Sequence, residues 1–233
     1  KLVILASLAF GIPLKFDAVY TEGITELTTQ DVGYALELGY IIKHLGIAKQ
    51  HAEGVELRVH PTLIPDHLLL SDVDGVKNAV LVEGSAVGPT LYYGAGAGAQ
   101  PTASAVVADL VDLARTFGVE QSNRVPALGI AQSSLRDLPI IPMANIETPW
   151  YLRMEVADKP GVLSRVASIF SEQGISIEAL IQKAPAEGQT LVSLIVLTNK
   201  APQGSVDTAV GGIEALDAIS GKVTRIRVEA LDG

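Results

Sequence analysis

Hydrophobic and polar positions divide the first half of the chain into helices and paired strands. Residues 2–10 are apolar nearly all round, which predicts a helix packed inside a domain, and Gly11 ends it. Thr28 or Thr29 can cap the amides of a second helix, which stops at Gly39. Four further apolar runs predict two antiparallel strand pairs, residues 40–48 with 54–61 and 78–84 with 88–93.

Residues 91–102 predict a strand, a glycine turn and the start of a helix. Alternating glycines at residues 94–98 remove the Cβ restriction on the backbone, and Pro101 suits the first turn of a helix over 102–116. A helix N-terminus approached by backbone without side chains can bind phosphate or another anion. The alternative is a tight turn buried under the helix.

Prolines become frequent over residues 120–149, which predicts a linker between two domains, although residues 138–143 can pack locally. The segment that follows reads strand, helix, strand, strand, helix, strand. Its elements are expected at residues 150–156, 162–173, 176–182, 190–197, 206–216 and 223–228, with turns at 158–161 and 186–188. This βαββαβ order is typical of the ferredoxin-like fold.

The predicted fold class is therefore α/β (α+β) with two domains. A mixed-sheet domain spans residues 1–119, a linker spans 120–149, and the ferredoxin-like domain spans 150–233. With 233 residues, 48% of them apolar, the chain can build cores for both.

Composition excludes several classes of chemistry. The chain has no cysteine, which removes disulfides and thiolate nucleophiles and suits a reducing compartment such as the cytoplasm. A net charge of −9 argues against a nucleic-acid surface. The apolar start is too short to span a bilayer and shows no cleavage site, so we interpret the chain as a fragment of a longer protein. The four histidines lack ligand spacing, so no metal site is predicted.

The turn at residues 158–161 carries the clearest binding chemistry. Asp158 and the freed backbone at Gly161 lie between a strand end and a helix start. A carboxylate beside exposed amides can hold both ends of a zwitterionic amino acid. The alternative is that Asp158 only caps the helix that begins at Val162.

Residues 155–163 (Glu-Val-Ala-Asp-Lys-Pro-Gly-Val-Leu) and 169–177 (Ile-Phe-Ser-Glu-Gln-Gly-Ile-Ser-Ile) resemble the ACT domain, a small-molecule sensor of amino-acid metabolism. The resemblance implies an effector site where two such domains pair. One domain would supply Asp158, Gly161, Val162 and Leu163, and its neighbour Ser176 and Ile177. Gln182, at the end of that strand, is a candidate side-chain contact, with an ordinary edge residue as the alternative.

Residues 1–118 resemble the catalytic domain of homoserine dehydrogenase, through residues 1–6, residues 39–46 and the glycine junction continued to Asp109. The family's D-x-x-x-K signature implies that Lys1 is the proton donor to the substrate carbonyl, although the signature's aspartate would precede residue 1. An ammonium suits that role because hydride transfer to an aldehyde develops negative charge on oxygen. Without the resemblance, a terminal lysine is a solvated residue.

The resemblance also implies cofactor, substrate and effector. Gly96, Gly98 and Ala99 would abut the nicotinamide end of NADP or NAD, aspartate 4-semialdehyde would be reduced to homoserine, and threonine would be the effector of a dimer or tetramer. A complete G-x-G-x-x-G fingerprint is absent, so this chain alone is expected to show no dehydrogenase activity. The alternative is a stand-alone amino-acid-binding regulatory protein with a non-catalytic dimerisation domain.

Overall fold

A computed structural model describes residues 1–120, 123–126, 129–183 and 191–231. The chain forms two compact units. The first comprises Lys1–Asp66 and Arg136–Ala230, and the second is formed mainly by His67–Leu135. Short 3-10 helices are present at η1 (Phe16–Ala18), η2 (Leu69–Asp72), η4 (Gln132–Ser134) and η5 (Met143–Asn145).

The first part of unit 1 contains the predicted helices and one predicted strand pair. β2 (Tyr40–Gln50) and β3 (Val55–Pro65) pair antiparallel along their whole length, as expected. Thr28 caps α2 (Thr29–Glu37) in a capping box: its hydroxyl accepts from the Asp31 N–H at 3.3 Å, and its own N–H donates to the Asp31 carboxylate at 3.1 Å.

α1 (Leu2–Phe10) ends at Gly11, whose φ of +61° is the left-handed conformation that glycine adopts most readily. The prediction that this helix is packed inside a domain is wrong for the described chain. Ile4, Leu5 and Leu8 are 53%, 43% and 44% exposed, and only Ala6 and Ser7 are buried. The helix meets β2 and β3 through one face, so its apolar residues are not covered all round.

The ferredoxin-like order is confirmed. The elements are β6 (Glu147–Ala157), α4 (Val162–Glu172), β7 (Ile177–Gln182), β8 (Leu191–Pro202), α5 (Gln203–Glu214) and β9 (Ile219–Val228). Their strands pair antiparallel in the order β9-β6-β8-β7. The turn predicted at residues 186–188 lies outside the described residues. β6 and β8 are longer than predicted because their ends continue to pair, Glu147 with Pro202.

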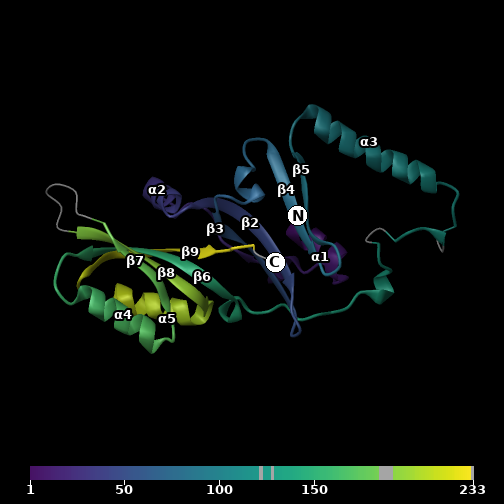
Figure 1. The fold of residues 1–233 in the computed structure, drawn as a ribbon. Coiled ribbons are helices and arrows are strands. Elements are labelled where there is room, and N and C mark those ends of the chain that lie inside the picture. Colours follow the sequence, from purple (N-terminus) through teal and green to yellow (C-terminus); the bar gives the residue numbers. More distant parts are fainter. Residues whose placement is uncertain (121–122, 127–128, 184–190, 232–233) are drawn as a thin grey trace. The chain divides into compact units, whose positions relative to one another are not determined.

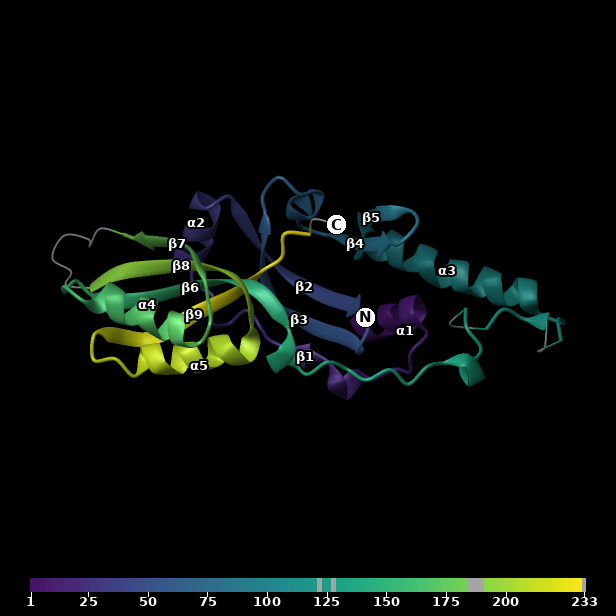
Figure 2. The same cartoon turned by 60° about the horizontal axis from the view of Figure 1, so that its bottom comes forward.

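The described residues of unit 1 form a seven-stranded sheet. β3 pairs parallel with β9 at Thr62–Arg227 and Leu63–Val228, and with the short β1 (Tyr20–Thr21). Figures 1 and 2 show α4 and α5 on one face of this sheet and α2 on the other. Alternate residues of β6 serve the two faces: Trp150 and Leu152 pack in the α4–α5 core, and Tyr151 packs in the cluster beside α2.

Part of the predicted linker is packed. The N–H of Val55 donates to Pro139 O, and the N–H of Ile141 donates to Val55 O, each at 2.9 Å. Arg136 N–H donates to Gly11 O at 2.8 Å. Local packing over 138–143 was expected, whereas the whole of Arg136–Ala230 belongs to one compact unit with the start of the chain. The domain boundaries at 119 and 149 stay a prediction.

Unit 2 contains the second predicted hairpin and the glycine junction. β4 (Lys77–Gly84) pairs antiparallel with β5 (Gly88–Ala95), as expected. α3 (Ala99–Thr116) begins three residues before the predicted start, so Pro101 lies within its first turn. Over the described ranges, no helix is long and apolar enough to cross a membrane.

Candidate functional site

The turn after β6 lines a pocket of about 310 Å³ formed by residues 156–163 and Gln182. Gln182 Nε2 donates to Asp158 Oδ1 at 3.4 Å across it. The fold therefore brings together five of the seven residues predicted for the effector: Asp158, Gly161, Val162, Leu163 and Gln182.

The first turn of α4 forms one wall of this pocket. Gly161 precedes the helix with a φ of +89°, and no side chain caps it, so the interpretation of Asp158 as a helix cap is wrong. The carboxylate of Asp158 and the helix N-terminus thus both remain at the pocket. A carboxylate suits an ammonium group and a helix N-terminus suits a carboxylate, which is the charge pattern of a free amino acid.

Ser176 and Ile177 lie at the opposite end of β7 from Gln182. Ser176 O accepts from Asn199 N–H at 2.9 Å, and Ile177 pairs with Thr198. They do not line the pocket of their own chain. Their expected contribution, from a neighbouring copy, stays a prediction.

Lys1 precedes α1 and is exposed; its carbonyl accepts from Leu5 N–H at 3.1 Å. The first turn of α1 lies against β2, because a β-carbon built at Gly46 would be 3.5 Å from Cδ1 of Leu2. The structure thus places the predicted proton donor at the start of a helix seated on the β2–β3 sheet. Its role stays a prediction.

The glycine junction is open to solvent. Residues 92–100 are all exposed, so the interpretation as a turn buried under a helix is wrong. Gly98, with a φ of +116°, precedes α3, which begins at Ala99 without a side-chain cap. Gly96 N–H donates to Val76 O at 3.1 Å, and a β-carbon at Gly96 would collide with the Asn78 amide. An uncapped helix start reached over Cβ-free backbone fits the approach of a dinucleotide.

A second cavity of unit 1, of about 360 Å³, lies between η1, β3 and residues 140–146. Its buried charges are already matched: Arg58 donates to Glu56 at 3.1 Å and to Glu229. No residue predicted for binding or catalysis lines it. Within the described ranges, no group of three or more His, Asp or Glu side chains could hold a metal ion.

Three buried arginines, not predicted from the sequence, join the start of the chain to the ferredoxin-like domain. Arg58 pairs with Glu229, Arg153 with Asp31, and Arg227 with Glu22. Arg227 also lies over the Trp150 ring, 4.8 Å from its centroid. The available signal was a charged residue at alternate positions of otherwise apolar strands, as at Arg58 and Arg153.

Comparison with known proteins agrees with this arrangement. Residues 1–111 match the family model for homoserine dehydrogenase, and residues 150–214 match the model for the ACT domain. A homoserine dehydrogenase of Pseudomonas aeruginosa is 54% identical over 232 residues, which is 100% of this chain and 54% of that protein. The chain belongs to the homoserine dehydrogenase family. The homoserine dehydrogenases are an oxidoreductase family. In this chain the homoserine dehydrogenase domain comes first and an ACT domain follows it.

Other homoserine dehydrogenases show the same correspondence. The Neisseria gonorrhoeae protein is 47% identical over 99% of this chain and 53% of its own length. The crystal structure of a homoserine dehydrogenase from Thiobacillus denitrificans superposes with a TM-score of 0.93 at 53% identity, over 100% of this chain and 52% of that one. A Staphylococcus aureus structure gives 0.66 at 25% identity, over 99% and 52%. The chain thus spans about half the length of the relatives it matches.

Proposed function

We propose that this chain is the substrate-binding and regulatory half of a homoserine dehydrogenase that reduces aspartate 4-semialdehyde to homoserine with NADPH or NADH. The observation that carries the proposal is the match of the whole chain, at 54% identity, to a protein of that name. The proposed setting is an oligomeric enzyme of threonine and methionine biosynthesis in the cytoplasm.

Lys1 is the proposed proton donor. Hydride addition to the aldehyde leaves negative charge on its oxygen, which a positioned ammonium stabilises before it donates a proton. Exposure of Lys1 at the start of α1 supports the role, because the side chain is available to a substrate. The bound nicotinamide nucleotide supplies the hydride, and the proposed contacts to it are the backbone at Gly96, Gly98 and Ala99.

The test of the catalytic role is a kinetic comparison in the longer polypeptide that contains this chain. We expect Lys1→Met to lower kcat/KM by about 10²- to 10⁴-fold, the usual contribution of a general acid. Lys15→Met is the control, because Lys15 instead pairs with Asp137 at 2.5 Å. Equal activity of Lys1→Met and the parent would contradict the assignment, and absence of turnover in the parent would favour the regulatory-protein alternative.

Threonine is the proposed ligand of the pocket at residues 156–163, and calorimetry on the 233-residue chain tests it. The Asp158 carboxylate would hold the ammonium group, and the first turn of α4 the carboxylate. We expect Asp158→Asn to weaken binding by about tenfold, since a hydrogen bond to a charged group contributes about 1.5–3 kcal/mol. Asp207→Asn, on α5, is the control. No heat with threonine would remove this effector assignment without touching the role of Lys1.

A further inference from the structure

We propose that α2 is the element through which the amino-acid pocket acts on the β2–β3 sheet and the start of α1. The inference rests on the proposed amino-acid site and adds which element transmits ligand binding at that site to the rest of unit 1. Two charged residues close to the pocket are bonded to α2: Arg153 on β6, and Lys183, which directly follows β7.

The β6 contact is a buried ion pair. Arg153, three residues before the first pocket residue Val156, donates from Nε to Asp31 Oδ1 at 2.5 Å and from Nη2 to Oδ2 at 3.2 Å. Asp31 is fully buried and Arg153 is 9% exposed. Tyr151, on the same face of β6, donates to Asp31 Oδ1 at 3.3 Å. Two parallel hydrogen bonds fix direction as well as distance, so a shift of β6 is passed to Asp31.

Asp31 also sets where α2 begins. The oxygen Oδ2, which takes one bond from Arg153, also accepts from the N–H of Thr28 at 3.1 Å and from its hydroxyl at 2.6 Å. Burial alone would raise the pKa of Asp31, but hydrogen bonds from Arg153 and Thr28 outweigh it and hold the pKa below its ordinary value. One carboxylate therefore joins the sheet to the helix cap.

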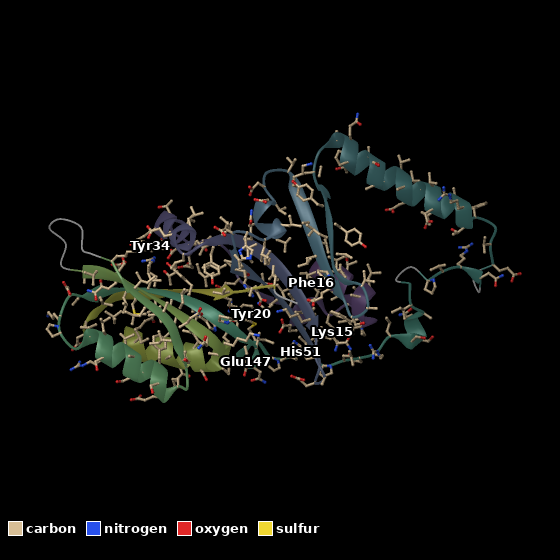
Figure 3. The ribbon with its side chains drawn as sticks, viewed as in Figure 1. Lys15, Phe16, Tyr20, Tyr34, His51 and Glu147 are labelled. Atoms are coloured by element: carbon tan, nitrogen blue, oxygen red, sulfur yellow. The ribbon has the colours of Figure 1, made fainter. Side chains whose placement is uncertain are left out.

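The β7 contact reaches the other end of α2. Lys183 follows the pocket residue Gln182, and its ammonium pairs with Glu37, the last residue of α2. The same ammonium lies 5.2 Å from the centroid of the Tyr34 ring. Figure 3 shows Tyr34 on α2, above the sheet edge that carries β7. α2 is thus bonded at its first turn to β6 and at its last turn to the residue that directly follows β7.

β2 is the strand through which a change in α2 would reach α1. Gly39, with a φ of +78°, turns the chain from α2 directly into β2, and Tyr34 and Tyr40 pack in the same apolar cluster. Farther along β2, Gly46 lies against Leu2, next to Lys1. A displacement of α2 is therefore transmitted along one strand to the first turn of α1.

A ligand shifts an equilibrium only if it binds one arrangement better than another. An amino acid held between Asp158, Gln182 and the α4 terminus would fix the separation of the two strand ends. The arrangement of α2 that fits this separation would be favoured. Opening of α2 should then become rarer when the pocket is filled.

Amide hydrogen exchange with threonine as the probe tests the coupling in the 233-residue chain. Exchange reports the local opening free energy of each segment. We expect threonine to slow amide exchange at residues 162–166, the start of α4 beside the pocket. We also expect it to slow amide exchange at residues 29–37 and 40–50 about fivefold, the lower end of ordinary allosteric coupling.

Two variants break the contacts separately. Lys183→Gln removes the exposed pair with Glu37, and Asp31→Asn weakens the buried pair with Arg153. Trp150 fluorescence checks that the Asp31→Asn variant is folded. In each, the slowing at residues 29–37 is expected to fall to about twofold, with slowing at 162–166 retained. The matched control is Asp207→Asn, which removes the surface pair with Arg225 between α5 and β9.

The outcomes separate the coupling from the site. Suppose that threonine gives binding heat in calorimetry and slows amide exchange at residues 162–166, but does not change exchange over residues 29–50. This result would overturn the coupling and leave the amino-acid site in place. An equal loss in Asp207→Asn and Lys183→Gln would also overturn it, because the effect would then be general. Absence of heat would remove the site and the coupling together.

Discussion

At the residue scale, His60 shows how the fold sets a protonation state. It is fully buried on β3, where Arg58 Nη1 donates to its Nε2 at 2.8 Å and its Nδ1 lies 2.9 Å from Pro61 O. Nε2 is therefore the acceptor and Nδ1 carries the proton. Burial first, and then the charge of Arg227, lower the pKa of His60 to about 3.

This arrangement predicts a pH-dependent stability. Below pH 6.5 the unfolded chain takes up a proton at His60 while the folded protein does not, so stability falls as the pH drops. The slope from one such group is roughly 1.4 kcal/mol per pH unit. Denaturant unfolding between about pH 6.5 and about pH 5, above the range where carboxyls titrate, measures it.

The variant His60→Gln should remove this slope while lowering stability at neutral pH, because the glutamine does not titrate but fits Arg58 less well. The exposed His67 provides the control: His67→Gln should keep the slope. An unchanged slope in His60→Gln would contradict the assignment.

At the element scale, the same substitution has opposite effects at two glycines. Gly33 lies inside α2 with nothing within 4 Å of a built β-carbon. Gly174 follows α4 with a φ of +68°, where an L-residue is strained. Helix interiors therefore gain from a β-carbon and helix ends of this kind lose from it.

We expect Gly33→Ala to stabilise unit 1 by about 0.5–1 kcal/mol. Gly174→Ala should destabilise it by about 1–2 kcal/mol, the usual cost of the left-handed conformation for an L-residue. Urea unfolding of both variants beside the parent measures the difference. Two shifts of the same sign would show that the assigned helix bounds are wrong.

At the scale of the whole molecule, the ferredoxin-like domain shares one sheet with the start of the chain. β3 pairs with β9, and buried pairs such as Arg58–Glu229 and Arg153–Asp31 cross between them. Removing one partner of a buried pair leaves an uncompensated charge, so these contacts favour joint unfolding.

Joint unfolding has a direct test, because Trp150 is the single tryptophan and is 1% exposed in the core of the ferredoxin-like domain. We expect its fluorescence and the exchange of amides over residues 40–65 to report the same unfolding midpoint in urea. Separate midpoints would support independent domains with the predicted boundaries at 119 and 149.

Local signals were enough for the elements and for most of the pocket. Alternation along β6, the capping residue Thr28 and the glycines at 11, 161 and 174 act within a few residues of one another, so the chain itself carries the information. Asp158, Gly161 and Gln182 could be named for the same reason: each lies at the end of a predictable strand or helix.

Partners distant along the chain depended on the tertiary structure. Arg153 and Asp31 are 122 residues apart, and Arg58 and Glu229 are 171 apart, so no local pattern links them. The exposure of α1 and the contact of residues 139–141 with Val55 were likewise decided by which surfaces meet. Side-chain chemistry states what a residue can bind, but burial and pairing depend on what the fold brings beside it.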